Sequence, residues 1–147
     1  MNTSIATLLE HKGAAVRSVA STVSVSDAVK EMNRHKIGSV LVMDGPRLAG
    51  IFTERDVLTR VVAADLDPKS TPISRVMTAN VLTIAPETTM QQMMDTFSEK
   101  RCRHMPVVKD GNILGLISIG DVSRWVANSH RAEAESLRQY IGGGLSA

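Results

Sequence analysis

The sequence predicts an α/β (α+β) fold in which two consecutive β-α-β-β-α repeats pack with pseudo-twofold symmetry. The first observation is an internal repeat: a shift of 65 positions, which carries Gly50 onto Gly115, aligns the two halves without a gap from residue 16 to residue 61. The second is that both halves show strand and helix periodicity in the same order. Because about 50 residues bury a sheet poorly alone, we expect the two copies to pack against each other.

Each repeat is predicted to begin with a short extended segment and a helix. "AVRSVA" and "NVLTIA" are the extended segments, and "SDAVKEMNRHK" and "TTMQQMMDTFSEKR" follow them as helices. Ser26 and the pair Glu87-Thr88 are expected to supply caps or first-turn carboxylates. The apolar residues at helical spacing, which predict the buried faces, are Ala28, Val29 and Met32 in the first helix and Met90, Met93, Met94 and Phe97 in the second.

A hairpin and a second helix are predicted to complete each repeat. "SVLVM" and "MPVV" are short apolar runs typical of buried strands. "DGPR" and "KDGN" carry the Asp-Gly turn signal, and "RLAGIFT" and "NILGLIS" form the returning strands. Each returning strand leads directly into a helix.

The predicted organisation has four parts. They are a first repeat with its N-terminal segment at 1–65, a linker at 66–78, a second repeat at 79–129, and a C-terminal helix with a Gly-rich tail at 130–147. The linker prediction rests on "AADLDPKSTPISRVMT", which is polar and has two prolines. Gly142 to Gly144 are expected to stop the last helix. Its thin apolar stripe, expected to dock on a partner subunit or pack on its own domain, is Ala132, Leu137, Tyr140 and Ile141.

Composition excludes several classes of function. The chain of 147 residues is 43% hydrophobic and 22% charged, as globular proteins are. A net charge of +2, with no block of five like charges, argues against a nucleic-acid partner. No apolar run approaches membrane-spanning length and the first residues lack a signal-peptide pattern, so we expect a cytoplasmic protein with no membrane partner.

Motifs of catalytic or metal chemistry are also missing from the sequence. The four histidines form no HExxH pair, and no GxSxG, GxxxxGK[ST] or GxGxxG occurs. Cys102 is the single cysteine and aligns with the apolar Ile37, which predicts a buried, inert thiol.

The most specific feature is a corner that occurs in both repeats, Gly-apolar-apolar-Thr/Ser-x-x-Asp, at Thr53 with Asp56 and at Ser118 with Asp121. One interpretation is structural, because this spacing forms a capping box at a helix start. The other is functional, because a carboxylate there can accept two hydrogen bonds from the vicinal diol of a ribose while helix amides accept phosphate. A hydroxyl can serve both roles, so the sequence leaves both open.

Together these features resemble the cystathionine-beta-synthase (CBS) domain pair, or Bateman module, of the stand-alone type. The resemblance rests on the repeated unit, on the paired strands "VLVMDGPRLAGIFT" and "MPVVKDGNILGLIS", on the corners, and on "RVMTANVLTIAPETTM" before the second unit. It covers about residues 16 to 128.

The resemblance implies a regulatory module without catalytic residues. Such modules bind AMP, ADP, ATP, NAD(H) or S-adenosylmethionine in two clefts between the repeats and require no metal. The implied ribose-binding residues are Thr53, Asp56, Ser118 and Asp121. The implied adenine-binding residues are Val19, Met77, Ala79, Val81, Pro106 and Val107.

Phosphate groups of such a ligand need cations. The end of the first helix of the second repeat supplies Arg101, Arg103 and His104, and cations there can also simply complement the helix dipole. The resemblance implies phosphate-binding residues just before the first hairpin strand, a place that Arg103 and His104 match. The first repeat has the uncharged Gly38 and Ser39 there, and only Lys36 and Arg55 are nearby substitutes. We therefore expect unequal clefts, with phosphate-rich ligands favouring the one at Asp121.

The resemblance also implies a homodimer that modulates a separate, unidentified protein. A second interpretation stays open, in which the module serves dimerisation or protein interaction and its clefts bind no nucleotide. A third, nucleic-acid binding through Arg101 and Arg103, is disfavoured by the low charge and by an aromatic content of 3%.

Overall fold

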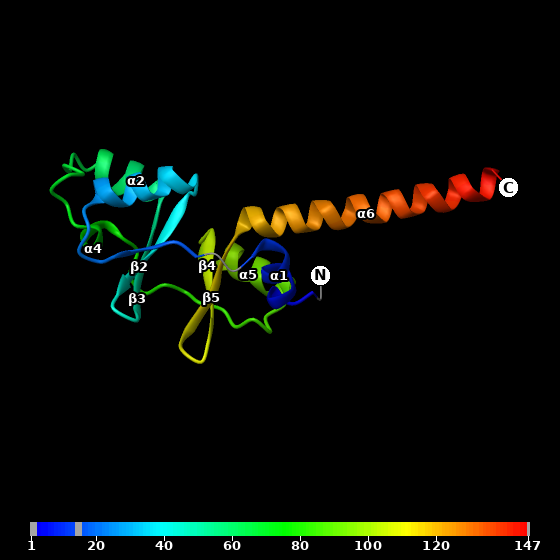
Figure 1. Ribbon diagram of the computed structural model, residues 1–147, viewed down its shortest axis with the longest axis horizontal. Coiled ribbons are helices and arrows are strands. Elements are labelled where there is room, and N and C mark those ends of the chain that lie inside the picture. The colour runs from blue at the N-terminus through cyan, green and yellow to red at the C-terminus, as the bar shows by residue number, and fades with distance from the viewer. Residues whose placement is uncertain (1–2, 14–15, 147) are drawn as a thin grey trace. The chain divides into compact units, whose positions relative to one another are not determined.

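The computed structural model describes residues 3–13 and 16–146, with side chains described as far as residue 139 (Figure 1). The chain forms two compact units, Ala15–Leu82 and Met1–Ala14 together with Thr83–Ala147. Each unit contains one of the two repeats, with a small sheet and helices. The mixed α/β fold of two repeats is therefore confirmed.

The first repeat has the predicted β-α-β-β-α order. It runs through β1 (Ser18–Ala20), α2 (Val25–His35), β2 (Ser39–Asp44), β3 (Arg47–Thr53), the short α3 (Glu54–Asp56), a π-helical segment η1 (Val57–Val62) and α4 (Ile73–Val76). The sheet order is β1-β2-β3, with β1 parallel and β3 antiparallel to β2. This register sets Ser39 opposite Thr53 at the end of the hairpin.

The segment predicted as a polar linker is part of this unit's core. Ile73 and Val76, spaced i, i+3 on α4, are buried with the apolar faces of α2 and β2. The backbone of Thr78 pairs with Ile51 on the edge of β3. Proline content suggested an open linker, but Pro72 is the N-cap residue of α4 and so starts structure instead of ending it.

The second repeat lies in the other unit. Its elements are α1 (Ile5–Lys12), α5 (Met90–Lys100), β4 (His104–Lys109), β5 (Asn112–Ser118) and α6 (Ile119–Ser146). β4 and β5 form an antiparallel hairpin in which His104 faces Ser118. The buried faces match the predicted spacing, since Met90, Met93 and Phe97 all lie in the core.

The extended segment predicted for "NVLTIA" is wrong in extent, because it is reduced to one parallel bridge between Ile84 and Val107. In the first repeat, the ladder continues as the Ser21 nitrogen donates to the Met43 oxygen at 2.9 Å. The position equivalent to Ser21 is Pro86, which has no N–H to donate. The second ladder therefore ends after Ile84.

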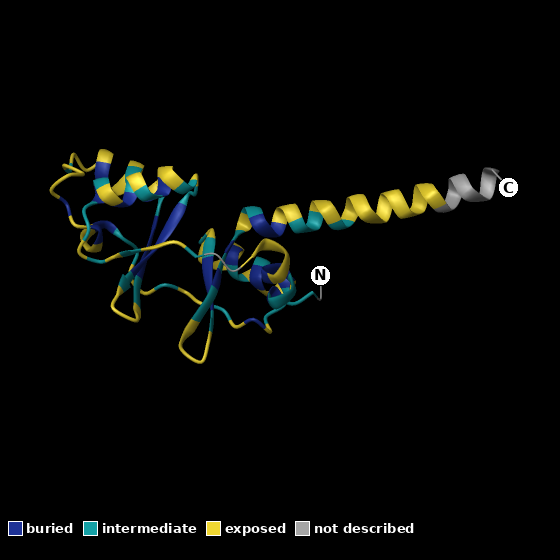
Figure 2. Ribbon diagram, viewed as in Figure 1, coloured by how far each residue is buried: buried dark blue, intermediate teal, exposed yellow. Residues whose placement is uncertain are grey.

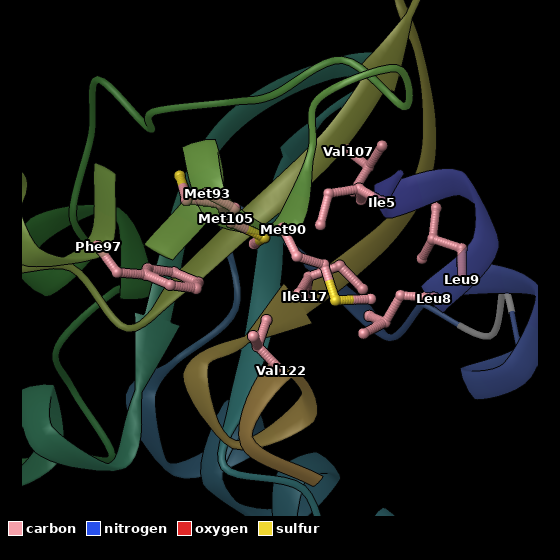
Figure 3. Packing of buried hydrophobic residues seen from close by; sticks show 10 residues of the cluster. All are labelled: Ile5, Leu8, Leu9, Met90, Met93, Phe97, Met105, Val107, Ile117 and Val122. Carbon is pink, nitrogen blue, oxygen red and sulfur yellow. The ribbon is translucent and has the colours of Figure 1, made fainter. Parts of the chain in front are cut away.

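Helix α1 was not predicted and completes the second repeat's core (Figure 3). Ile5, Leu8 and Leu9 bury the inner face of the helix, and the Ser4 side chain caps its start. The nitrogen of Ile5 donates to the Thr88 oxygen at 2.8 Å. The sequence-based division grouped residues 1–65 together, whereas the structure places this N-terminal helix with the second repeat.

Several helix ends differ from the predicted ones. The N-cap residues are Ser24 and Thr89 and not Ser26 or Glu87-Thr88. In each helix, the side chain that accepts from the N3 backbone N–H lies one or two residues from the predicted position. The second helix of the second repeat and the expected C-terminal helix are one element, α6, which passes through Gly142 to Gly144. Glycine costs a helix about 1 kcal/mol per residue but forbids no helical geometry.

Most side chains of α6 from residue 127 to residue 139 are exposed (Figure 2). Ala132 and Leu137 of the predicted stripe face solvent, Leu137 with 60% of its surface exposed. Tyr140 and Ile141 lie outside the residues whose side chains are described. No helix in the described part of the chain is both long and apolar enough to cross a membrane.

Candidate functional site

The first corner joins β3 to α3. The Thr53 hydroxyl accepts from the Asp56 nitrogen at 3.3 Å, and Asp56 Oδ2 accepts from the Thr53 nitrogen at 2.9 Å and from its hydroxyl at 3.2 Å. This reciprocal pair is a capping box, so the structural interpretation is confirmed. Only 8% of Asp56 is exposed. A strand ending in a β-conformation at Thr53 and turning into a helix forces this arrangement.

The second corner repeats the first at the junction of β5 and α6. Asp121 Oδ2 accepts from the Ser118 nitrogen at 2.8 Å, and the Ser118 hydroxyl accepts from the Asp121 nitrogen at 3.1 Å. Asp121 is 8% exposed. Each repeat thus fixes one carboxylate at the start of its second helix, where the helix dipole favours negative charge.

Both carboxylates also meet cations that the sequence analysis did not select. The Arg60 Nε lies 3.5 Å from Asp56 Oδ1, and Arg124 donates to Asp121 Oδ1. Their i+4 and i+3 spacing along the chain was a signal available in the sequence. Lys12 donates to Asp121 Oδ2 at 2.7 Å across 109 residues of sequence. No local pattern could have revealed this third cation.

The charge state of Asp121 follows from these contacts. Burial alone would raise the pKa of this carboxyl, but the hydrogen bond from Lys12 and those from Ser118 outweigh it and hold the pKa below its usual range. Asp121 is therefore a carboxylate at neutral pH. An ionised oxygen acceptor is what a diol-binding carboxylate requires.

Two of the predicted phosphate-binding residues lie beside the second corner. His104 faces Ser118 across the hairpin, and the Arg103 oxygen accepts from the Ile119 nitrogen at 2.9 Å. Arg101 is farther along the chain, as the exposed residue that ends α5 with a φ of 53°. The hairpin thus brings Arg103 and His104, but not Arg101, directly to the corner's backbone.

The first corner gathers less positive charge from its predicted residues. Ser39 faces Thr53, and the Gly38 oxygen accepts from the Glu54 nitrogen at 3.0 Å, so uncharged residues occupy the matching places. Lys36 ends α2 and lines a groove of about 530 Å³ between α2 and η1. Arg55 is exposed on α3.

The predicted adenine-binding residues differ in how far their side chains are exposed. Val107 is fully buried in the second repeat's core, which leaves its backbone and not its side chain for any contact with a ligand. Alternation along β4 explains this burial, because Met105 and Val107 both face that core. Pro106 is also buried, and its oxygen accepts from the Ile84 nitrogen at 3.0 Å.

The other adenine candidates lie in the first repeat's unit. Val19 and Met77 are half-buried against its core. Met77 fills the space beside Gly50, where an added Cβ would lie 2.6 Å from its sulfur. Ala79 is exposed and Val81 is half-buried.

Redox and metal chemistry find little support among the described residues. Cys102 is half-buried, and burial raises the pKa of its thiol, which favours the unreactive protonated form. No three His, Cys, Asp or Glu side chains gather where they could hold a metal ion in the part of the chain described here.

Comparison with known proteins agrees with the repeated fold. Residues 14–63 and 73–128 each match the CBS domain family. The mitochondrial CBS domain-containing protein CBSX3 of Arabidopsis thaliana is 40% identical over 126 residues, which cover 82% of this chain and 61% of CBSX3. The chain therefore spans about three fifths of the length of that relative.

Solved structures show the same similarity. A candidate signal-transduction protein with CBS domains from Burkholderia ambifaria MC40-6 matches with a TM-score of 0.81 and 38% identity, over 84% of this chain and 93% of that one. The CBS-domain protein ATU1752 from Agrobacterium tumefaciens matches with a TM-score of 0.79 and 37% identity, over 83% and 98%. Stand-alone proteins of this kind are typically regulatory and not catalytic. The chain thus belongs to the CBS domain family, as a protein with two CBS domains in tandem.

Proposed function

We propose that this protein is a regulatory sensor of adenosine-containing ligands, which it binds through the ribose at Asp56 and Asp121 and whose presence it passes to a separate protein. CBS domains commonly bind adenosine ligands. The observation that carries the proposal is the pair of equivalent carboxylates, each held by a backbone N–H at 2.8 or 2.9 Å in its repeat. A carboxylate with a fixed orientation can accept both hydroxyls of a vicinal diol without further ordering.

The proposed ligand binds at the two corners and is AMP, ADP, ATP, NAD(H) or S-adenosylmethionine. Arg103 and His104 lie beside the second corner, which supports a preference for phosphate-bearing ligands there. Binding to both repeats would favour one relative packing of them, which is how ligand state would reach a partner. A homodimer is part of the proposal, since CBS proteins often oligomerise.

Isothermal titration tests this proposal. The wild-type protein, Asp56→Ala and Asp121→Ala are each titrated with AMP, ATP, NADH and S-adenosylmethionine. The matched control is Asp27→Ala, because Asp27 is also the third residue of a helix capped by a serine but lies on the exposed start of α2. We expect micromolar binding, about −8 kcal/mol, and loss of one site in each corner variant but not in the control.

The alternative is an interaction module whose clefts bind no nucleotide. The reciprocal bonds of Thr53 with Asp56 and of Ser118 with Asp121 also cap their helices, which is the observation that favours this alternative. If the folded protein gives no heat with any of these ligands yet remains dimeric in light scattering, the alternative holds and the nucleotide proposal fails.

A further inference from the structure

The side chain of Lys12 occupies the carboxylate of the second corner. Its Nζ donates to Asp121 Oδ2 at 2.7 Å and also to the Leu116 oxygen. Arg124 donates to the other carboxylate oxygen, Oδ1. A ribose diol that is to use Asp121 therefore meets a carboxylate whose two oxygens already accept from cations.

Helix α1 is held in place by packing contacts, whereas its last side chain, Lys12, is partly exposed. Leu9 packs on Gly115 of β5, where an added Cβ would lie 2.5 Å from Leu9 Cδ2. The ring of His11 meets that of Trp125 edge-on, with centroids 4.7 Å apart. Lys12 itself is 35% exposed. A lysine ammonium on a flexible four-carbon stem can move to another anion without movement of the helix.

The first corner has a different arrangement among the described residues. Asp56 Oδ2 accepts only from the nitrogen and hydroxyl of Thr53 in the hydrogen bonds found there. Its cation, Arg60, lies only four residues further along the chain, in η1, which directly follows α3, and also donates to the Met77 oxygen at 3.0 Å. A diol at Asp56 would thus displace no cation supplied from a distant part of the sequence.

We propose that Lys12 makes the second corner selective for phosphorylated nucleosides over nucleosides, by exchanging the Asp121 carboxylate for a ligand phosphate. This inference rests on the proposed function. Adenosine would separate Lys12 from Asp121 and offer it no replacement anion. AMP carries the diol and a phosphate on one ribose, so it replaces the lost ion pair with a new one. Lys12 is therefore a specificity-determining residue, in addition to linking α1 to Asp121.

The first test needs no ligand. Because Lys12 is the main group that lowers the pKa of Asp121, Lys12→Met should raise that pKa, measured by carbon NMR of the Asp121 carboxyl across an acid titration. Lys30→Met is the control, since Lys30 is exposed on α2 of the other unit. An Asp121 pKa that Lys12→Met leaves unchanged would overturn the inference.

The second test measures discrimination by calorimetry in an Asp56→Ala background, which leaves only the second corner. We expect Lys12→Met to bind adenosine more tightly and to reduce the preference for AMP over adenosine about tenfold or more, the effect of one charge-assisted hydrogen bond. Lys12→Arg should keep most of that preference, and Lys30→Met all of it.

The outcomes separate the two claims. An unchanged preference in Lys12→Met, with AMP binding that Asp121→Ala abolishes, overturns the inference and leaves the proposed function intact. The absence of AMP binding in the wild-type protein and in every variant overturns both.

Discussion

Asp56 and Asp121 hold the same place in their two repeats, each accepting at Oδ2 from the backbone nitrogen of the residue that ends the preceding strand, at 2.9 and 2.8 Å. The two differ in their cations. Arg60 approaches Asp56 at 3.5 Å from the adjoining segment η1, whereas Lys12 reaches Asp121 at 2.7 Å from the distant helix α1. Because the two equivalent corners have unequal charge environments, we expect substitutions at Asp56 and Asp121 to change stability by unequal amounts. We also expect the two corners to bind ligands with unequal affinity.

Removing the Asp121 carboxylate should destabilise the protein in a pH-dependent way. Asp121→Ala loses several charged hydrogen bonds at a buried site, so we expect a loss of about 1–3 kcal/mol at pH 7. The folded pKa lies below the ordinary value of 3.8, so this stabilisation is present above pH 3.8 and is lost as pH falls towards the folded pKa. Urea unfolding at pH 7 and at decreasing acid pH measures it.

The control for that experiment is Asp27→Ala, which removes one exposed first-turn carboxylate. It should cost about 0.5 kcal/mol or less, the usual effect of an exposed site. If the difference in unfolding free energy between Asp121→Ala and wild type stays constant down to the lowest pH, the assigned contacts of Asp121 are contradicted.

The two equivalent glycines should respond differently to alanine. A Cβ at Gly50 would lie 2.7 Å from the backbone oxygen of Thr78, while at Gly115 it would meet the flexible end of Leu9 at 2.5 Å. A side chain yields more easily than a paired backbone, so Gly50→Ala should cost about 1–3 kcal/mol and Gly115→Ala less. Thermal and urea unfolding of both variants measure the two losses of stability. A larger loss for Gly115→Ala than for Gly50→Ala would refute the packing described.

Leu9→Ala should relieve the second clash. In a double-mutant cycle, Gly115→Ala and Leu9→Ala are expected to couple favourably, because the new methyl fills part of the space that Leu9 leaves. Additive free energies of unfolding would show that the two residues do not meet.

Helix α1 should be needed for stability. Leu8 is 2% exposed in the second repeat's core, so Leu8→Ala should cost about 2–5 kcal/mol. Leu137→Ala, at a position 60% exposed on α6, is the matched control and should change stability by at most about 0.5 kcal/mol. Equal melting temperatures for both variants would mean that α1 does not belong to that core.

Cys102 should react slowly with electrophiles. Burial raises the pKa of its thiol, so less thiolate is present at pH 7 than in a free thiol. The rate of alkylation by iodoacetamide, followed from pH 7 to pH 10 beside glutathione, should be lower and should rise at higher pH. A faster reaction than glutathione at pH 7 would contradict this assignment.

The sequence predicted features that depend on neighbours along the chain. The 65-residue shift located both corners, and helical spacing located the buried Met90, Met93 and Phe97. Features that depend on distant partners were missed. Lys12 and Asp121 are 109 residues apart, and nothing near either residue indicates the pair.

Other errors came from patterns that were present but interpreted too simply. Ile5, Leu8 and Leu9 follow helical spacing after Ser4. This pattern would have been enough to predict α1, but it was not used. The prolines around residue 70 suggested a linker, although Ile73 and Val76 share the i, i+3 spacing of a buried helix. The burial of the Val107 side chain could not be predicted from the sequence, because both sides of β4 are apolar.

The measurement that tests the central claim most directly compares AMP with 2′,3′-dideoxy-AMP by isothermal titration of the wild-type protein. The two ligands differ only in the ribose diol that Asp56 and Asp121 are proposed to accept. We expect AMP to bind with micromolar affinity and the dideoxy analogue to bind at least about tenfold more weakly, since charge-assisted hydrogen bonds are lost. Equal affinities would contradict the proposed role of the two carboxylates.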